Sequence, residues 1–131
     1  MIYLLDVNAL IALGHIDHTF HARVSRWLGS LQRPILATCS ITELGFVRIL
    51  AHSSAYRLSL AGARDLLISL KQSKAYPFHF FADHNDISQL PEWVETARQV
   101  TDGHLLGLAA THGAKLATLD RGIPGAFLIP S

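Results

Sequence analysis

The sequence has little charge and one cysteine, and each shortage excludes a class of protein. Only 16% of its 131 residues are charged while 50% are hydrophobic, which excludes a disordered chain and favours a compact globule. The lone Cys39 cannot form an internal disulfide, so we expect a protein of the reducing cytoplasm. The net charge of +1 gives no bulk basic signal, so any contact with nucleic acid must come from a local patch.

Long uninterrupted hydrophobic runs are missing as well. The apolar N-terminal segment MIYLLDVNALIAL has no basic region before it and is interrupted by Asp6. This pattern predicts neither a signal peptide nor a membrane span, so we expect a soluble protein without a membrane partner. There is no internal repeat, low-complexity tract or evident linker, and we therefore expect a single domain over residues 1–131.

Strand-like and helix-like patterns alternate along the chain. Short apolar runs predict strands at residues 2–5, 35–38, 78–81, 115–119 and 126–129. Amphipathic spacing predicts helices at 7–13, within 14–31, at 40–51, within 57–73 and at 101–112, whereas residues 82–99 are expected to form turns and a loop. Such alternation predicts an α/β sandwich around a mainly parallel sheet.

Four acidic residues fall near the predicted carboxyl ends of the strands, where α/β folds bind ligands. Asp6 directly follows the first strand, and Asp120 lies just past the strand at 115–119. Glu43 and Asp102 lie in the first turns of helices beside that edge. Each acid also has a structural explanation. The sequence places Asp6 before a helix at Val7, Ser40 and Glu43 in a capping-box pattern, Thr101 or Asp102 at a helix start, and Asp120 in a turn.

Taken together, the four acids favour a cation site. Carboxylates that converge repel one another and raise each other's pKa, unless a cation lies between them. Carboxylate oxygens, with Asn8 as a neutral partner, suit Mg²⁺ or Mn²⁺. The chemistry that such an ion supports is metal-assisted hydrolysis of a phosphodiester bond.

Three segments of the sequence resemble the signature blocks of the PIN-domain nucleases, and most of all the VapC-like ribonuclease toxins of toxin–antitoxin pairs. The segments are LLDVNALIAL, SITELGFVRIL and QVTDGHLLGLAATHGAKLATLDRG, in the order found in the family. The resemblance implies a three-layer α/β/α sandwich and a Mg²⁺- or Mn²⁺-dependent endoribonuclease that hydrolyses RNA. It also implies a homodimer and a cognate antitoxin protein that covers the acidic groove.

The same resemblance implies roles for individual residues. Asp6, Glu43, Asp102 and Asp120 match the catalytic, metal-binding acids, and Asn8 and Thr118 match polar residues that support them. Some family members carry a further acid shortly after the third one, where this chain has His104. His104 and Arg121 are therefore candidates for contact with RNA, and each has a simple surface role as its alternative.

Several other residues have a possible functional role, but the sequence favours a structural one. His15, His18 and His21 do not share one helix face and have no cysteine nearby, so a solvated helix start near the groove is expected rather than zinc, with its histidines as candidates for contact with RNA. Trp27, at helical spacing, and Cys39, after a buried strand, are expected in the core. Arg48, Arg98 and Lys115 are expected as surface charges, and Trp93 as a loop residue of open role.

Two other functions compete with the nuclease. A catalytically quiet PIN-like module that binds RNA or a protein would show no cleavage with any divalent ion, but binding alone does not need four converging acids. A haloacid-dehalogenase-like phosphatase also starts from an aspartate after the first strand. It requires a second aspartate where this chain has Asn8.

Overall fold

The fold alternates strands and helices, as expected. The computed structural model describes all residues, 1–131. Its elements are β1 (Ile2–Leu5), α1 (Val7–Gly14), α2 (His21–Gly29), β2 (Ile35–Cys39), α3 (Ser40–His52), α4 (Leu60–Lys71), β3 (Phe78–Phe81), α5 (Val100–Thr111), β4 (Lys115–Thr118) and β5 (Phe127–Leu128), with short 3₁₀ turns at Ile87–Gln89 and Ala97–Gln99. No helix has the length and hydrophobicity needed to cross a membrane.

The five strands form one sheet in the order β3-β2-β1-β4-β5. Every neighbouring pair of strands is parallel. The sheet is therefore entirely parallel, whereas the sequence predicted a mainly parallel one. The chain leaves β1 toward β2 and β3 on one side and later returns to β4 and β5 on the other. The direction of winding therefore reverses between β1 and β4, which is where open α/β sheets bind their ligands.

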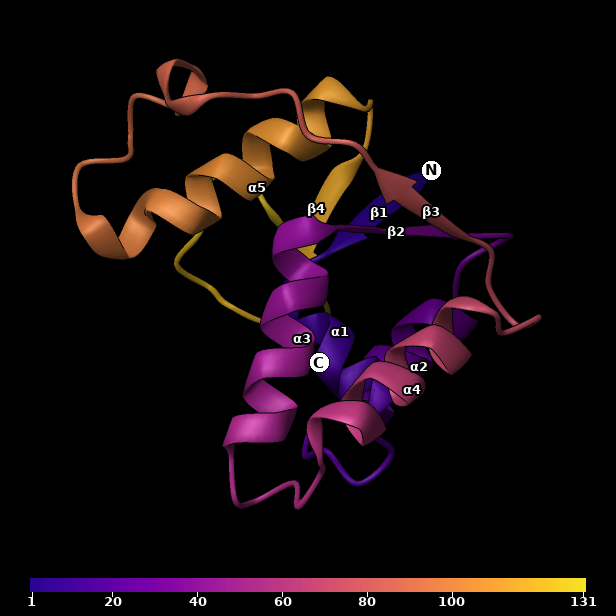
Figure 1. The fold of residues 1–131 in the computed structure, drawn as a ribbon. Coiled ribbons are helices and arrows are strands. Elements are labelled where there is room, and N and C mark those ends of the chain that lie inside the picture. Colours follow the sequence, from indigo (N-terminus) through magenta and orange to yellow (C-terminus); the bar gives the residue numbers. More distant parts are fainter.

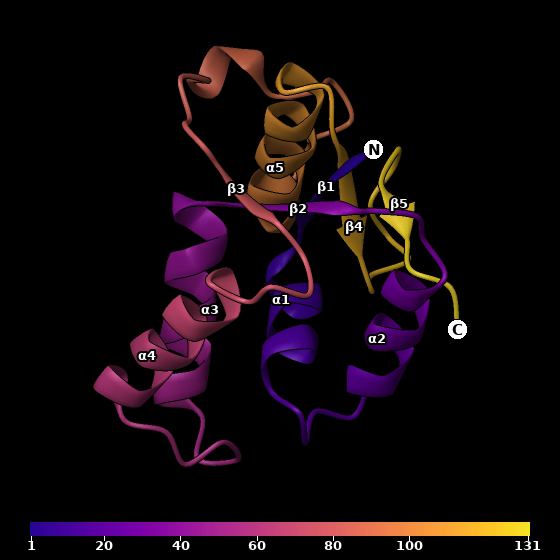
Figure 2. The same ribbon diagram turned by 90° about the vertical axis from the view of Figure 1, so that its right-hand side faces the viewer.

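Helices cover both faces of the sheet, which confirms the three-layer α/β/α sandwich (Figures 1 and 2). Helix α5 lies on one face, and α1 to α4 lie on the other (Figure 2). The strand residues alternate accordingly: Tyr3 and Leu5 pack with the helices of the larger layer, whereas Leu4 packs with α5. This period of two explains why such short strands are hydrophobic throughout, since both of their faces are buried.

Most helix and strand boundaries agree with the expectations to within a few residues. Gly113 ends α5 with φ +67, the left-handed conformation that glycine adopts most easily at this position. Helix α2 is shorter than its sequence pattern, because His15 to Phe20 form a turn before it. Trp27 and Cys39 are buried in the two parts of the core, as predicted.

The expected capping boxes and caps were only partly right. Asp6 does cap α1, since its carboxylate accepts a hydrogen bond from the backbone N–H of Val7 at 2.8 Å. The box at the start of α3 is shifted by one residue: Cys39 is the cap, and its backbone N–H donates to Thr42 Oγ1 at 3.0 Å. Asp102 caps nothing, because α5 already begins at Val100. The predicted capping role of Asp102 is therefore wrong.

Candidate active site

The site forms at the reversal point of the sheet, between β1 and β4. Leu5 is paired with Ala117 across these two strands, so the residues that follow them emerge side by side. The backbone N–H of Asp6 donates to the carbonyl of Ala117 at 2.9 Å. Asp6 and Asp120 thus lie at the carboxyl ends of adjacent strands, where the sequence placed them.

Asp6 is held from both sides of its carboxylate. One oxygen accepts the N–H of Val7 at 2.8 Å, and the other accepts the hydroxyl of Thr118 at 2.7 Å. Only 7% of Asp6 is exposed, and Thr118 is fully buried. A buried carboxylate with both oxygens bonded cannot rotate without losing a hydrogen bond, so its position is fixed before any ligand arrives.

Thr118 connects the other polar residues of the site. Its hydroxyl accepts from Asn8 Nδ2 at 3.3 Å and from the backbone N–H of Asp120 at 3.0 Å, while it donates to Asp6. A hydroxyl has one donor and two acceptor sites, and all of them are used. Asn8 in turn accepts the backbone N–H of Leu119 at 3.2 Å, which ties the first turn of α1 to the end of β4.

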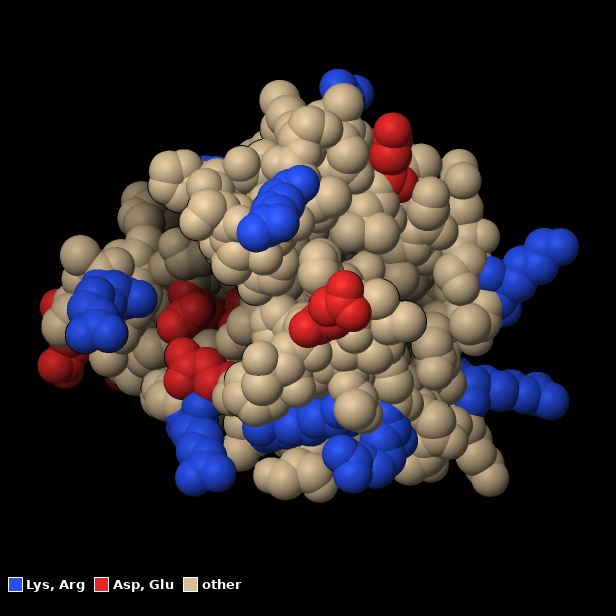
Figure 3. Space-filling model, turned by 90° about the horizontal axis from the view of Figure 1, so that it is seen from below, with Lys and Arg blue, Asp and Glu red and all other residues tan.

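Three carboxylates line one cavity of about 390 Å³. Asp6 and Asp120 come from the sheet edge, and Asp102 comes from the first turn of α5. The lining is completed by three apolar side chains, one amide and two aromatic rings: Val7, Ile11, Ile49, Asn8, His18 and Tyr56. No lysine or arginine lines this cavity. Figure 3 shows acidic side chains gathered at a recess of the surface, with Lys and Arg side chains around it.

Burial, and then mutual repulsion, raise the pKa values of two of these carboxylates. Burial raises the pKa of Asp102 above its ordinary 3.8, and the charges of Asp6 and Asp120 raise it further. Burial also raises the pKa of Asp6; the hydrogen bonds from Thr118 and Val7 oppose this rise without cancelling it, and Asp120 adds to it. The cavity therefore holds negative charge that no protein cation compensates.

Glu43 lies apart from the other three acids. Its carboxylate accepts the hydroxyl of Thr38 at 2.6 Å and forms an ion pair with Lys71 at 2.5 Å. It lines a separate, largely apolar groove between α3 and α4. Of the four acids expected to meet, three therefore line one cavity, and the fourth, Glu43, is paired with Lys71.

The donor atoms of the cavity fit a hard divalent cation. They are carboxylate oxygens, with the amide of Asn8 beside them, and Mg²⁺ or Mn²⁺ prefers such ligands. No three acidic, histidine or cysteine side chains in the chain lie close enough to coordinate one ion together. This arrangement suits an ion that keeps several waters and takes only one or two carboxylates, as Mg²⁺ usually does.

The two candidates for RNA contact do not line the carboxylate cavity. His104, on α5, pairs through Nε2 with Asp83, which follows β3. Although burial alone would raise the pKa of Asp83, its hydrogen bonds with His104 and Asn85 lower it. Arg121 is exposed, makes no ion pair and lines none of the cavities of the molecule.

Two aromatic side chains contribute to the site, and the sequence predicted only one of them, His18, near the groove. Tyr56 lies in the connection between α3 and α4, and His18 lies in the turn before α2. Neither belongs to a recognisable motif, and only the packing of α1 against α2 and α3 brings them to the carboxylates. Arg98, expected as a surface charge, lines a neighbouring cavity together with Asp102 and Asp120.

Comparison with known proteins agrees with this architecture. The PIN domain family matches residues 3–126. The chain is 39% identical to ribonuclease VapC38 of Mycobacterium tuberculosis, over 92% of this chain and 86% of the relative. It is 36% identical to ribonuclease VapC39 of the same species, over 92% of this chain and 89% of the relative.

Two solved structures share the fold at low sequence identity. Mycobacterium tuberculosis VapC20, described as a toxin that cleaves the sarcin–ricin loop, matches with a TM-score of 0.60 and 14% identity, over 89% of this chain and 87% of that chain. Rickettsia felis VapBC2, bound to a DNA fragment from its promoter, matches with a TM-score of 0.56 and 14% identity, over 98% of this chain and 97% of that chain. The chain therefore belongs to the PIN domain family, within the group whose curated members are named ribonuclease VapC.

Proposed function

We propose that this protein is a divalent-metal-dependent endoribonuclease and the toxin of a toxin–antitoxin pair. The observation that carries the proposal is the set of uncompensated carboxylates at the reversal point of the sheet, in a chain whose relatives are named ribonucleases. Asp6, Asp102 and Asp120 form the proposed site of Mg²⁺ or Mn²⁺, with one or two of the carboxylates bound to the ion directly and the others through its waters. When bound, such an ion lowers the pKa of a water molecule and neutralises charge on phosphate oxygens.

The residues of the chain have distinct tasks in this proposal. Thr118 and Val7 fix Asp6, so that the carboxylate meets the ion without reorganising. Asn8 holds Thr118 in place and keeps the end of β4 against α1. Glu43 contributes only after it leaves Lys71, since the pair now neutralises its charge.

The partners follow from the same family placement. We propose single-stranded RNA as substrate and a cognate antitoxin as inhibitor, supported by the VapBC2 complex that shares the fold. We also propose a homodimer in the cytoplasm, as the resemblance of the sequence implies.

RNA cleavage with purified protein tests the function. With Mn²⁺ or Mg²⁺ present, the parent protein should cleave single-stranded RNA, and Asp102→Asn should cleave at least about 100-fold more slowly. Asp65→Asn is the matched control, because Asp65 is exposed on α4 and lines no cavity. Equal cleavage by the parent and Asp102→Asn would show that the site assignment is wrong.

One observation favours the catalytically quiet binding module as a second candidate. Lys71 already forms an ion pair with Glu43, so this carboxylate is not free to take part in ion binding. That module predicts RNA binding without cleavage in the presence of every divalent ion tested. Expression of the parent chain separates the two as well, because a ribonuclease toxin arrests growth and Asp102→Asn relieves the arrest. A binding module gives the same growth with both chains.

A further inference from the structure

A second cavity adjoins the carboxylate cavity and has different chemistry. It has a volume of about 380 Å³, within the range of small-ligand sites. Its lining includes His15, His18 and Tyr56, with Asp17 as its one acidic and Arg57 as its one basic side chain, and these two do not pair with each other. His18 and Tyr56 line both cavities, so the two spaces share a wall. Whatever occupies the second cavity therefore lies next to the carboxylates.

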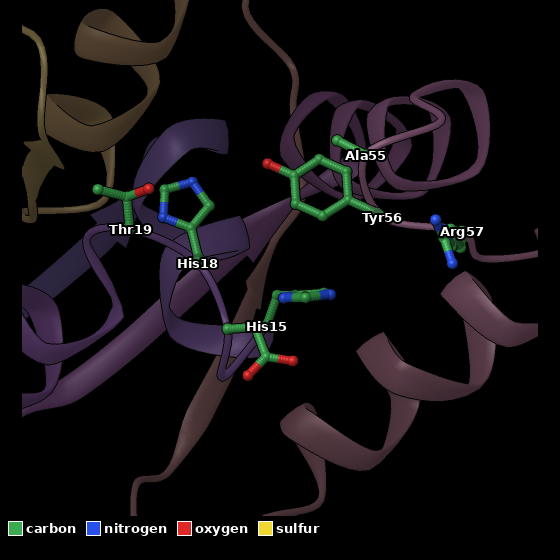
Figure 4. Close-up of a pocket in the computed structure, with 7 residues that line it drawn as sticks. His15, His18, Thr19, Ala55, Tyr56 and Arg57 are labelled. Atoms are coloured by element: carbon green, nitrogen blue, oxygen red, sulfur yellow. The ribbon is translucent and has the colours of Figure 1, made fainter.

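The shared wall is a flat aromatic surface. The rings of His18 and Tyr56 are parallel to within 6°, with centroids 6.5 Å apart. Figure 4 shows both rings face-on and beside one another, so they extend one surface rather than enclosing a gap. The ring of His15 stands at 66° to Tyr56, with centroids 5.0 Å apart, and supports it from the edge. Such a surface suits a planar, aromatic ligand.

His18 is held in a state that suits stacking and donation. The backbone N–H of Phe20 donates to its Nδ1 at 3.0 Å, so the ring proton is on Nε2 when the ring is neutral. Burial lowers the pKa of His18, and His15 and His21 lower it further, which favours the neutral form of the ring. Nε2–H has no partner in the protein and is available as a donor to a ligand.

A cation without a carboxylate partner stands at the far side of the same cavity. Arg57 is exposed, forms no ion pair and has φ 53, a left-handed conformation that a non-glycine residue seldom adopts. Asp102 and Asp120 also line a further cavity, together with Arg98. Each neighbouring pair of the three cavities therefore shares two lining residues, and an arginine lines each of the two cavities beside the carboxylates.

We propose that the cavity of His18, Tyr56 and Arg57 binds one unpaired nucleotide of the RNA, next to the phosphate that is cleaved. The base stacks on the His18 and Tyr56 rings, and Arg57 contacts its phosphate. Stacking on aromatic side chains accepts any base and requires an unpaired one, so this subsite selects single-stranded RNA. The inference rests on the proposed nuclease function, because that function places RNA at the carboxylates.

Titration with nucleotides tests the subsite separately from cleavage. The full chain is titrated, without divalent ions, with the four ribonucleoside 5′-monophosphates, while the ring protons of Tyr56 and His18 are followed by NMR. We expect upfield shifts from ring stacking, and none with ribose 5-phosphate, which has no base. Tyr56→Leu should weaken nucleotide binding about fivefold or more, whereas Tyr56→Phe should retain it.

Matched variants separate stacking from folding. Tyr76→Leu is the control, because Tyr76 also packs against the main core and lines no cavity. Arg57→Gln should weaken the binding of nucleotides and leave that of nucleosides unchanged. The subsite is refuted if no nucleotide shifts the Tyr56 and His18 signals, or if ribose 5-phosphate shifts them equally, even when the parent cleaves RNA. Shifts in a protein that does not cleave would instead refute the nuclease alone.

Discussion

The hydroxyl of Thr118 donates to the carboxylate of Asp6 at 2.7 Å, although 112 positions separate them in the chain. The bond spans two adjacent parallel strands at the point where the sheet reverses its winding. It fixes the most buried acid of the site and links it, through the same hydroxyl, to Asn8 and Asp120. One side chain thereby positions residues from three parts of the sequence.

Thr118→Val should destabilise the protein by about 1–3 kcal/mol, because it leaves Asp6, Asn8 and the Asp120 N–H short of a buried partner. The pKa of Asp6 should rise further, since the Thr118 hydrogen bond now lowers it. Urea unfolding measures the first effect and NMR titration of the carboxyl the second. Thr118→Ser, which keeps the hydroxyl, should lie close to the parent in both; equal losses in the two variants would speak against the hydrogen bond as cause.

Asp102→Asn should stabilise the metal-free protein at neutral pH. A carboxyl with a raised pKa binds its proton more tightly in the folded state, so the parent loses stability as the pH rises from 3.8 through the raised value. The asparagine of the variant does not titrate, so the variant does not lose stability in this way. Its free energy of unfolding should therefore exceed that of the parent by an amount that increases as the pH rises. Denaturation at several pH values measures it, and a variant less stable than the parent at pH 7 would contradict the proposed repulsion.

Mn²⁺ should raise the melting temperature of the parent by mass action, because the ion binds the folded site. The rise should be much smaller in Asp102→Asn and unchanged in Asp65→Asn, whose carboxylate is exposed and distant from the cavity. Thermal unfolding with and without Mn²⁺ measures this. An equal rise in all three proteins would place the ion elsewhere on the molecule.

Lys71→Met should raise the affinity for Mn²⁺, since Glu43 then has no competing cation and becomes available to the site. The loss of stability should stay below about 1 kcal/mol, because both side chains of this pair are partly exposed. Calorimetric titration with Mn²⁺ provides the affinity, and Lys74→Met, an exposed lysine without an ion pair, is the control. Unchanged affinity would indicate that Glu43 has no part in ion binding.

Gly103→Ala should destabilise the protein by about 1–3 kcal/mol. A Cβ at this position would meet Cγ2 of Val94 at 2.3 Å, so α5 or the preceding loop must move, and Asp102 moves with it. Gly107→Ala on the same helix would bring its Cβ only to an ordinary contact of 3.9 Å with the carbonyl oxygen of Gln89, and it should gain up to about 1 kcal/mol from helix propensity. Urea unfolding of both variants compares them, and similar stabilities would mean that the close packing at Val94 is easily relieved.

Local patterns predicted the elements well, because each pattern depends on neighbours in the chain. The apolar runs identified all five strands, and Gly113 marked the end of α5. The start of α3 at Ser40 was predicted correctly, but its capping box was placed one residue too late. This is because Thr42 bonds to the backbone of Cys39 and Glu43 bonds instead to Thr38 and Lys71. Sequence spacing cannot show which of two nearby partners a polar side chain takes.

The sequence by itself determined the α/β alternation, the family and the acids at the strand ends, since all of these are encoded by residue type and short spacing. Only the tertiary structure decided which acids share a cavity. It separated Glu43 from Asp6, Asp102 and Asp120, and it brought His18 and Tyr56 to the same wall. The physical reason is that these relationships depend on strand order and helix packing, which join residues that lie far apart in the chain.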